Sequence, residues 1–419
     1  MTIPLQNLRL ALLLYFLTKG LALTITTETT TRKKLREAYL PRKGRQSDMK
    51  TTALNVINQQ EMNEHIVDNG IHLTKEKERN LMEAYLQRIG FSLDENNTMR
   101  FSLQQKDGAE EENPIQIKNF QPTEKNLQTL YTQHLRHVPF ENMDQHSHPP
   151  PLDVESDIVT TTDKPIESNA KHIPRKTKSN LPSLNVYKSL QKIGKLNRGG
   201  FCYELNLSFC WLLRQLGFQA RLAVADVSCK QEIPAHVVVL VDDVLHTLTK
   251  IEGKKYDPNN SSRGTFLVDV GFGCPGVCDV ILPLESNQSY EDYHGDLFRF
   301  DNDQSQYPLH EGRFDTVLYR TRVDTPNEEN PMYRFHSKDD MDNDADEFQK
   351  GLEYVLNTSP TFNGKRLCVI STENGHVTLG SDYVKWVERW ETVKEEPIAD
   401  EESWRSALFQ HFGVHLDEE

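Results

Sequence analysis

The stretch that decides the fold is Arg198-Gly199-Gly200-Phe201-Cys202-Tyr203-Glu204-Leu205-Asn206. Its two glycines allow a tight backbone turn. Apolar residues then recur at the spacing of one helical face, until Gly217 interrupts the pattern: Leu205, Phe209, Leu212, Leu213 and Leu216. We therefore predict a helix that begins at Cys202.

A cysteine at the start of a helix is either a reactive thiol or a small apolar filler. Only about 3% of a free cysteine is thiolate at pH 7. The unpaired backbone N–H groups and the positive end of the helix dipole at Cys202 favour the thiolate. Unreactive buried cysteines are common too, so this residue alone leaves both interpretations open.

Three apolar runs after the helix predict strands over residues 220–227, 237–241 and 266–270. His236 comes immediately before the second run, and Asp269 lies in the third, ahead of Gly271-Phe272-Gly273. A cysteine nucleophile needs a base for its proton and a carboxylate that orients the imidazole. Singly, the histidine could be structural and the aspartate a turn residue. Their joint order predicts a Cys-His-Asp set.

These residues resemble the arylamine N-acetyltransferase family. The Arg198–Asn206 stretch is similar to the family's signature, and residues 236–241 and 267–273 are similar to its histidine and aspartate blocks, in the same order. Weaker similarities extend the resemblance from about residue 80 to the C-terminus, at Leu86–Gly90, Val138–Asn142 and Phe412–Leu416.

The resemblance implies that Cys202 is the nucleophile, His236 the base and Asp269 the residue that orients the base. It implies an acyltransferase of xenobiotic metabolism, which moves an acetyl or other short acyl group from acyl-coenzyme A to a small aromatic amine or hydrazine. An acyl-cysteine would be the intermediate. Phe272 would contact the substrate, with core packing as the alternative.

The resemblance also implies an α+β fold with a cysteine-protease-like core. We expect a leader and disordered segment over residues 1–72, and a helical domain with Cys202 and a long loop insertion over 73–217. A β-barrel-like domain with His236 and Asp269 would span 218–345, and an α/β C-terminal lid 346–419. The polar stretches 286–312 and 322–350 predict solvated insertions. A calcium loop in the second is disfavoured, because the glycine and closing glutamate of such a loop are missing.

Two other interpretations are compatible with the same residues. A cysteine hydrolase, such as a protease or amidase, would employ an identical Cys-His-Asp set, with water in place of the amine. A non-enzymatic relative would keep the fold with a blocked cleft, although the presence of all three residues speaks against it. In some family members, the residues just before the histidine contact the cofactor. Here these positions hold Glu232 and Ile233, and an acidic residue does not match that contact, so the coenzyme-binding residues stay unassigned.

The composition limits the classes of binding partner and the cellular compartment that we expect for this protein. A net charge of -14 argues against general nucleic-acid binding. Six cysteines are too few for a disulfide framework, and Cys274 and Cys278 lack a second ligand pair, so we expect no metal. The apolar run 10–17 is too short to span a bilayer. We expect a cytoplasmic enzyme, while residues 1–50 leave secretion or organellar targeting open.

Overall fold

A computed structural model describes residues 71–416, apart from gaps at 95, 97, 102–114, 147–158, 161–183, 228, 230–232, 248–261, 274–275, 277, 286–287, 303–312, 339–344 and 360–363. Four features that the sequence singled out lie outside the described residues: the leader up to residue 70, Glu232, Cys274 and the acidic run 339–344 that raised the calcium question.

Helices dominate the first part of the described chain: α3 (Lys75–Arg88), α4 (Glu124–His137), α5 (Val186–Leu190), the π-helix η3 (Gln191–Lys195) and α6 (Cys202–Gln215), with short 3-10 turns η1 (Ile117–Asn119) and η2 (Met143–His146). Threonine side chains cap two of them, because Thr74 accepts a hydrogen bond from the Lys77 amide and Thr123 from the Asn126 amide. The predicted helix that begins at Cys202 is confirmed.

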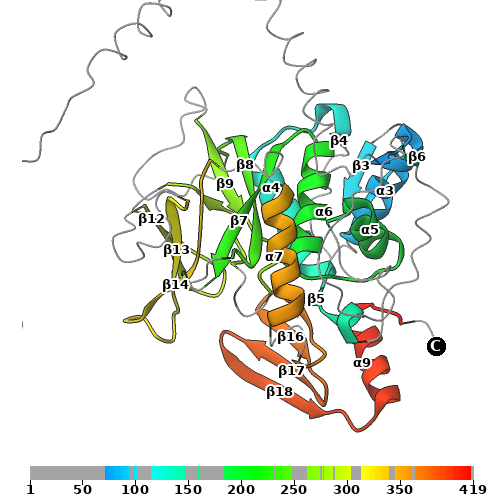
Figure 1. Ribbon diagram of the computed structural model, residues 1–419, viewed down its shortest axis with the longest axis vertical. Helices are drawn as coiled ribbons and strands as arrows, with labels where there is room; N and C mark the ends of the chain where they lie inside the picture. The colour runs from blue at the N-terminus through cyan, green and yellow to red at the C-terminus, as the bar shows by residue number, and fades with distance from the viewer. Residues whose placement is uncertain are drawn as a thin grey trace, which may run out of the picture. The chain divides into compact units, whose positions relative to one another are not determined.

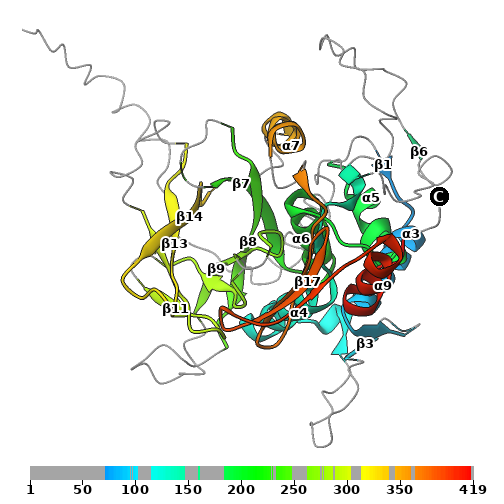
Figure 2. The ribbon, with the colours of Figure 1, turned by 90° about the horizontal axis from the view of Figure 1, so that it is seen from below.

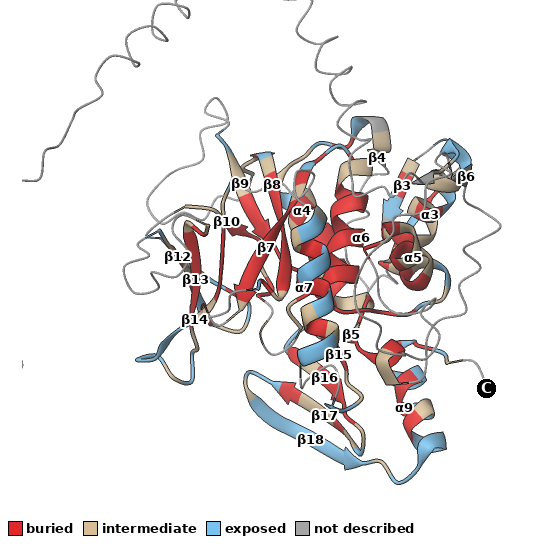
Figure 3. Ribbon diagram, viewed as in Figure 1, coloured by how far each residue is buried: buried red, intermediate tan, exposed pale blue. Residues whose placement is uncertain are grey.

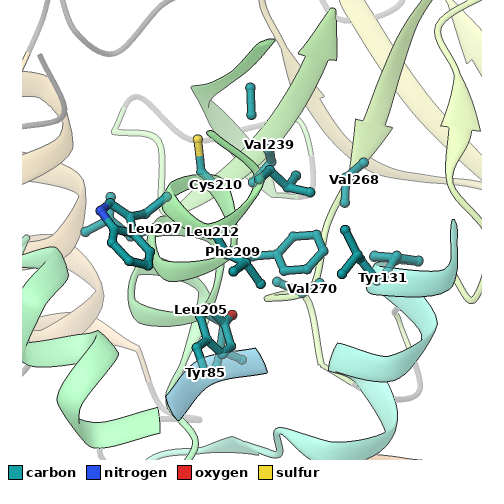
Figure 4. Close-up of a cluster of buried hydrophobic side chains, with 14 of the residues drawn as sticks. Tyr85, Tyr131, Leu205, Leu207, Phe209, Cys210, Leu212, Val239, Val268 and Val270 are labelled. Carbon is teal, nitrogen blue, oxygen red and sulfur yellow. The ribbon is translucent and has the colours of Figure 1, made fainter. Parts of the chain in front are cut away.

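Helix α6 lies at the centre of the hydrophobic core. Every residue from Cys202 to Leu213 is buried, so the helix is covered on all sides. Figure 3 shows it as buried along most of its length. Figure 4 shows Phe209 of this helix together with Tyr131 of α4 and with Val239 and Val268 from two strands. The helix therefore joins the helical part to the sheet.

The largest sheet is antiparallel and has eight strands in the order β10-β9-β8-β7-β14-β13-β12-β11 (Figure 1). The strands are β7 (Gln219–Val227), β8 (His236–Leu245), β9 (Arg263–Val268), β10 (Leu282–Pro283), β11 (Ser289–Glu291), β12 (Leu297–Asp301), β13 (Thr316–Thr321) and β14 (Glu329–Phe335). Strand β7 pairs both with β8, its neighbour in sequence, and with the distant β14. This non-local pairing gives the sheet its near-barrel character.

A second sheet of five strands, β18-β17-β16-β15-β5, lies in the C-terminal part of the chain (Figures 1 and 2). Its strands are β5 (Phe140–Glu141), β15 (Cys368–Ser371), β16 (Gly375–Leu379), β17 (Tyr383–Glu388) and β18 (Glu391–Pro397), and the helix α9 (Glu401–Phe412) follows them. Strands β15 and β16 form a hairpin. Strand β5 comes from the helical part, so this sheet connects the helical part with the C-terminal part of the chain.

The prediction that residues 286–312 and 322–350 are solvated insertions is wrong for much of their length. They contain β11, β12, β14 and the start of helix α7 (Ala345–Thr358). Polar residues in β12 alternate with the buried Phe298 and Phe300. Two of the acids are themselves buried: Asp296 pairs with Arg320, and Asp292 accepts two backbone N–H groups. The many carboxylates in this segment obscured the alternation of polar and apolar residues that is typical of a strand.

Two small sheets complete the described fold: β1 (Ile71–His72) with β6 (Val159–Thr160), and β2 (Phe91–Leu93), β3 (Thr98–Phe101) and β4 (Ile115–Gln116). Within the described ranges, no helix combines the length and the apolar character needed to cross a bilayer. The predicted α+β class, with a helical part, a near-barrel sheet and a mixed C-terminal part, is confirmed.

Candidate active site

The turn before α6 is fixed by backbone contacts with the strand β5. The Glu141 amide donates to the Gly200 carbonyl at 2.8 Å, and the Gly200 amide donates to the Pro139 carbonyl at 3.3 Å. A side chain at Gly199 would place its Cβ 1.9 Å from the Pro139 oxygen, so only glycine fits. The Glu204 carboxylate accepts the Phe201 amide at 3.3 Å and thereby caps the helix.

A buried cluster of five charged side chains lies behind this turn. The Lys192 ammonium contacts Asp144 at 2.7 Å and Glu204 at 3.0 Å, and the Arg198 guanidinium contacts Asp144 at 2.8 Å and Glu141 at 3.0 Å. Burial would raise the pKa of Glu141, but Arg198 and Lys192 lower it to about 2. Burial raises the pKa of Glu204 to about 7, against the opposing effect of Lys192. Arg198 therefore anchors the turn.

His236 opens β8 and lies between Cys202 and Asp269. Its Nε2 is 2.8 Å from Oδ2 of Asp269, which leaves Nδ1 for the hydrogen bond with the Cys202 thiol. Burial lowers the pKa of His236, but the charge of Asp269 and the hydrogen bonds to Asp269 and Cys202 outweigh it and raise the pKa to about 10. The imidazole is thus protonated at neutral pH and lies beside the Cys202 sulfur.

Asp269 follows the last residue of β9 and receives hydrogen bonds from several directions. The amide of Asn206 donates to its Oδ1 at 2.9 Å, and the Gly271 backbone N–H donates to the same atom at 3.0 Å. The Tyr333 hydroxyl is a further hydrogen-bond partner of the carboxylate. Burial would raise the pKa of Asp269, but His236, the Asn206 amide and the Gly271 N–H hold it below its usual value.

Asn206 connects all three parts of this site. It is fully buried, one helical turn after Cys202. Its Nδ2 donates to the Val237 carbonyl at 2.6 Å as well as to Asp269, and its Oδ1 accepts the Val270 amide at 3.0 Å. The sequence contained a signal for this role, since a polar residue four positions after Cys202 faces the same side of the helix.

Tyr333 could not be found from the sequence, because it comes from β14, more than 60 residues after Asp269. Its ring lies 5.5 Å from the His236 ring, and Phe272 lies 5.2 Å from the same ring in an edge-on arrangement. Phe272 is half-buried, and it borders a small cavity with Tyr131, Asp269 and Tyr333. The Phe272 and Tyr333 rings lie 5.3 Å from each other, so the two rings and the imidazole form one packed cluster.

Close approach between β9 and α6 depends on Gly271. A Cβ at this position would lie 2.6 Å from the Cys202 Cα and 2.6 Å from the Asn206 Nδ2. The site therefore has a thiol, an imidazole and a carboxylate in hydrogen-bonding sequence, which suits acyl transfer through a thioester. No group of three or more His, Cys, Asp or Glu side chains in the described part of the chain is arranged to hold a metal ion.

Comparison of the sequence with a model of the N-acetyltransferase family gives a match over residues 176–419. A comparison with curated proteins finds no match. Among solved structures, the arylamine N-acetyltransferase of Salmonella typhimurium is 19% identical with a TM-score of 0.53, over 83% of this chain and 94% of that one.

Two more solved structures are similar. The Bacillus cereus arylamine N-acetyltransferase, described as having a unique Cys-His-Glu catalytic triad, is 16% identical with a TM-score of 0.52, over 80% of this chain and 99% of that one. The Mycobacterium marinum enzyme in complex with CoA is 19% identical with a TM-score of 0.51, over 80% and 92%. At such identities the likeness shows the fold, whereas the family match covers more than half of the sequence. The chain belongs to the arylamine N-acetyltransferase family and is a transferase.

Proposed function

We propose that the protein transfers an acetyl or other short acyl group from acyl-coenzyme A to an arylamine or arylhydrazine through an acyl-Cys202 intermediate. One observation carries this proposal: His236 makes hydrogen bonds to Cys202 on one side and to Asp269 on the other. The complex of CoA with the related Mycobacterium marinum enzyme supports an acyl-coenzyme A donor.

In the first step, His236 holds the proton of Cys202, and the thiolate attacks the carbonyl carbon of the thioester. The carbonyl oxygen gains the electron pair, and the backbone N–H groups of Cys202 and Tyr203 are candidate donors to it. As the first residues of α6, they have no intrahelical acceptor. When the carbonyl re-forms, the bond to the coenzyme sulfur breaks, and the departing thiolate takes the proton from His236.

In the second step, the amine nitrogen attacks the acyl-cysteine and His236 removes its proton. Contact with Cys202 is one of the causes that raise the pKa of His236. By then the imidazole has given its proton to the departing coenzyme thiolate, so it is neutral and can act as a base. When the intermediate collapses, the carbon–sulfur bond breaks, Cys202 leaves as the thiolate, and His236 keeps the proton that it took from the amine, which restores the starting state.

Phe272 is our proposed contact for the aromatic acceptor. It packs edge-on against His236, and the rest of its side chain is half-exposed beside the small cavity. A flat amine against this ring would bring its nitrogen toward the imidazole. We leave the coenzyme-binding residues unassigned, since Glu232 lies outside the described residues and the neighbouring Ile233 is partly exposed.

We also propose a cytoplasmic location, a role in handling xenobiotic amines, and the division into a leader over 1–72 and domains over 73–217, 218–345 and 346–419. The location is supported by Asn206, which begins the glycan acceptor sequence Asn206-Leu207-Ser208. Its side-chain amide is buried and donates two hydrogen bonds, so a glycan there is incompatible with the fold.

Intact-mass analysis after incubation with acetyl-coenzyme A tests this function. We expect the wild type to gain one acetyl group and Cys202→Ala to gain none. Cys210→Ala is the matched control, because Cys210 is a buried cysteine two turns along the same helix, and it should be acetylated like the wild type. Acetylation of Cys202→Ala, or none in the wild type, would refute the proposal.

A further inference from the structure

The strand that carries Tyr333 is attached to the rest of the site over a short distance. Strand β14 meets β7 at three residue pairs, Tyr333 with Val227, Arg334 with Asp226 and Phe335 with Ala225. The next strand continues the ladder, because Ala225 pairs with His236. The position of Tyr333 beside His236 therefore depends on the register of β14 against β7.

Alternate residues of β14 point to opposite faces of the sheet. Tyr333 and Phe335 belong to the apolar cluster inside the sheet, where Tyr333 reaches the Asp269 carboxylate. A slip of one residue would exchange the faces and remove the hydroxyl from Asp269. Strand β14 is also paired with β13, so such a slip would move both strands relative to β7.

Arg334 and Asp226 face each other in this short ladder, and both are fully buried. The Arg334 Nε and Nη2 both lie 2.7 Å from Asp226 Oδ2, and the guanidinium carbon lies 4.8 Å from the centre of the Phe314 ring. Any other register would bury these two charges apart from each other, which low-polarity surroundings penalise strongly. The pair therefore selects one register out of several.

We propose that Asp226 and Arg334 are positioning residues, whose ion pair fixes β14 in the register that puts the Tyr333 hydroxyl on Asp269 and so orients His236. This inference rests on the proposed function, since it assigns these residues to the same site. The proposed ion pair lies outside the triad, on the face of β14 opposite to Tyr333.

A cycle of variants tests it: Tyr333→Phe, the charge-free pair D226L/R334M, and the triple variant. The readouts are the single-turnover rate of acetylation of Cys202 and the pH profile of its alkylation by iodoacetamide. We expect Tyr333→Phe and D226L/R334M each to slow acetylation roughly tenfold and to shift the alkylation profile in the same direction. The acetylation rate of the triple variant should be no lower than that of Tyr333→Phe or of D226L/R334M alone, because all three changes act through one hydroxyl.

Losses that multiply in the triple variant, or an unchanged rate in D226L/R334M, would overturn the inference. Arg334→Lys keeps a cation beside Asp226 but loses one nitrogen contact and the contact with Phe314, so its rate should lie between those of the wild type and D226L/R334M, which keeps the test valid if D226L/R334M folds poorly. Arg299→Met removes partly exposed ion pairs with Glu329 and Asp301 on the same sheet and should change neither readout. Because alkylation needs no acyl donor, a wild type that is alkylated but never acetylated would refute the proposed function and leave this inference testable.

Discussion

Among single residues, Asn206 best explains why three distant segments form one site. Its amide is shared among the start of α6, the start of β8 and the end of β9 through hydrogen bonds to Val237, Asp269 and Val270. Each partner is a buried polar group that no longer has access to water. One side chain therefore sets the separation of the proposed nucleophile, base and carboxylate.

We predict that Asn206→Ala lowers the free energy of unfolding by about 2–4 kcal/mol and slows acetylation of Cys202 roughly 100-fold. The physical reason is that the substitution leaves these partners unsatisfied. Ser208→Ala is the control, because the buried Ser208 hydroxyl has no hydrogen-bond partner in the described part of the protein. Urea unfolding and single-turnover kinetics check this, and equal effects of the two changes would contradict it.

The ion pair of His236 with Asp269 makes stability depend on pH. The pKa of His236 is about 10 in the folded protein and about 6.5 in an unfolded chain. Its contribution to stability is therefore complete below about pH 6.5 and is lost as the pH rises toward 10. The pKa of Asp269 is lowered in the folded protein. The stability that this carboxylate contributes is therefore present at neutral pH and is lost as the pH falls through its folded-state pKa.

We predict that the difference in free energy of unfolding between the wild type and His236→Gln is roughly a few kcal/mol at pH 6 and shrinks steadily toward pH 10. Urea unfolding at several pH values measures it. A difference that grows with pH would show that His236 is neutral in the resting enzyme.

At the level of elements, the site depends on how closely the end of β9 approaches the start of α6. A Cβ at Gly271 would lie 2.6 Å from Cys202 Cα, which is backbone and cannot rotate away. We predict that Gly271→Ala costs about 2–4 kcal/mol of stability and roughly 100-fold in acetylation rate.

Gly364→Ala is the matched control for this prediction, because a Cβ at Gly364 would meet nothing within 4 Å. Thermal unfolding and single-turnover acetylation of both variants provide the comparison. A Gly271→Ala enzyme with the wild-type rate would show that the close contact is dispensable.

Elements with local signals were predictable from the sequence, and those with distant partners were not. Thr123 caps α4 and the Arg198–Asn206 stretch starts α6, because both depend on residues a few positions away. Strand β14 was hidden in an acidic segment, since its place in the main sheet depends on pairing with β13 and with the distant β7. The role of Tyr333 was hidden for the same reason.

Across the whole described molecule, the five-stranded sheet contacts the eight-stranded sheet through the turn between β17 and β18. Trp390 in this turn has a φ of +72, which is costly for a large side chain. Arg320 and Arg322 lie against its ring at 4.3 and 3.9 Å, and its indole N–H donates to Asp296 at 3.1 Å. These contacts offset the backbone strain and hold the two sheets together.

We predict that Trp390→Ala lowers the free energy of unfolding by about 1–3 kcal/mol, because two cation–π contacts and a hydrogen bond are lost. Acetylation of Cys202 should stay within about twofold of the wild type, since the triad lies on other elements. Val393→Ala, an exposed change on β18, should alter neither property. A large loss of activity in Trp390→Ala would show that the contact between the sheets shapes the site.

The most direct test of acyl transfer is a chase of the isolated acetyl-enzyme. The enzyme is acetylated, freed of acetyl-coenzyme A, and mixed with an arylamine or with buffer, and intact mass and the released product are followed. We predict rapid loss of the acetyl group with one equivalent of N-acetylated amine, and slow loss in buffer. Release as acetate at the same rate with and without the amine would contradict the account and identify a hydrolase.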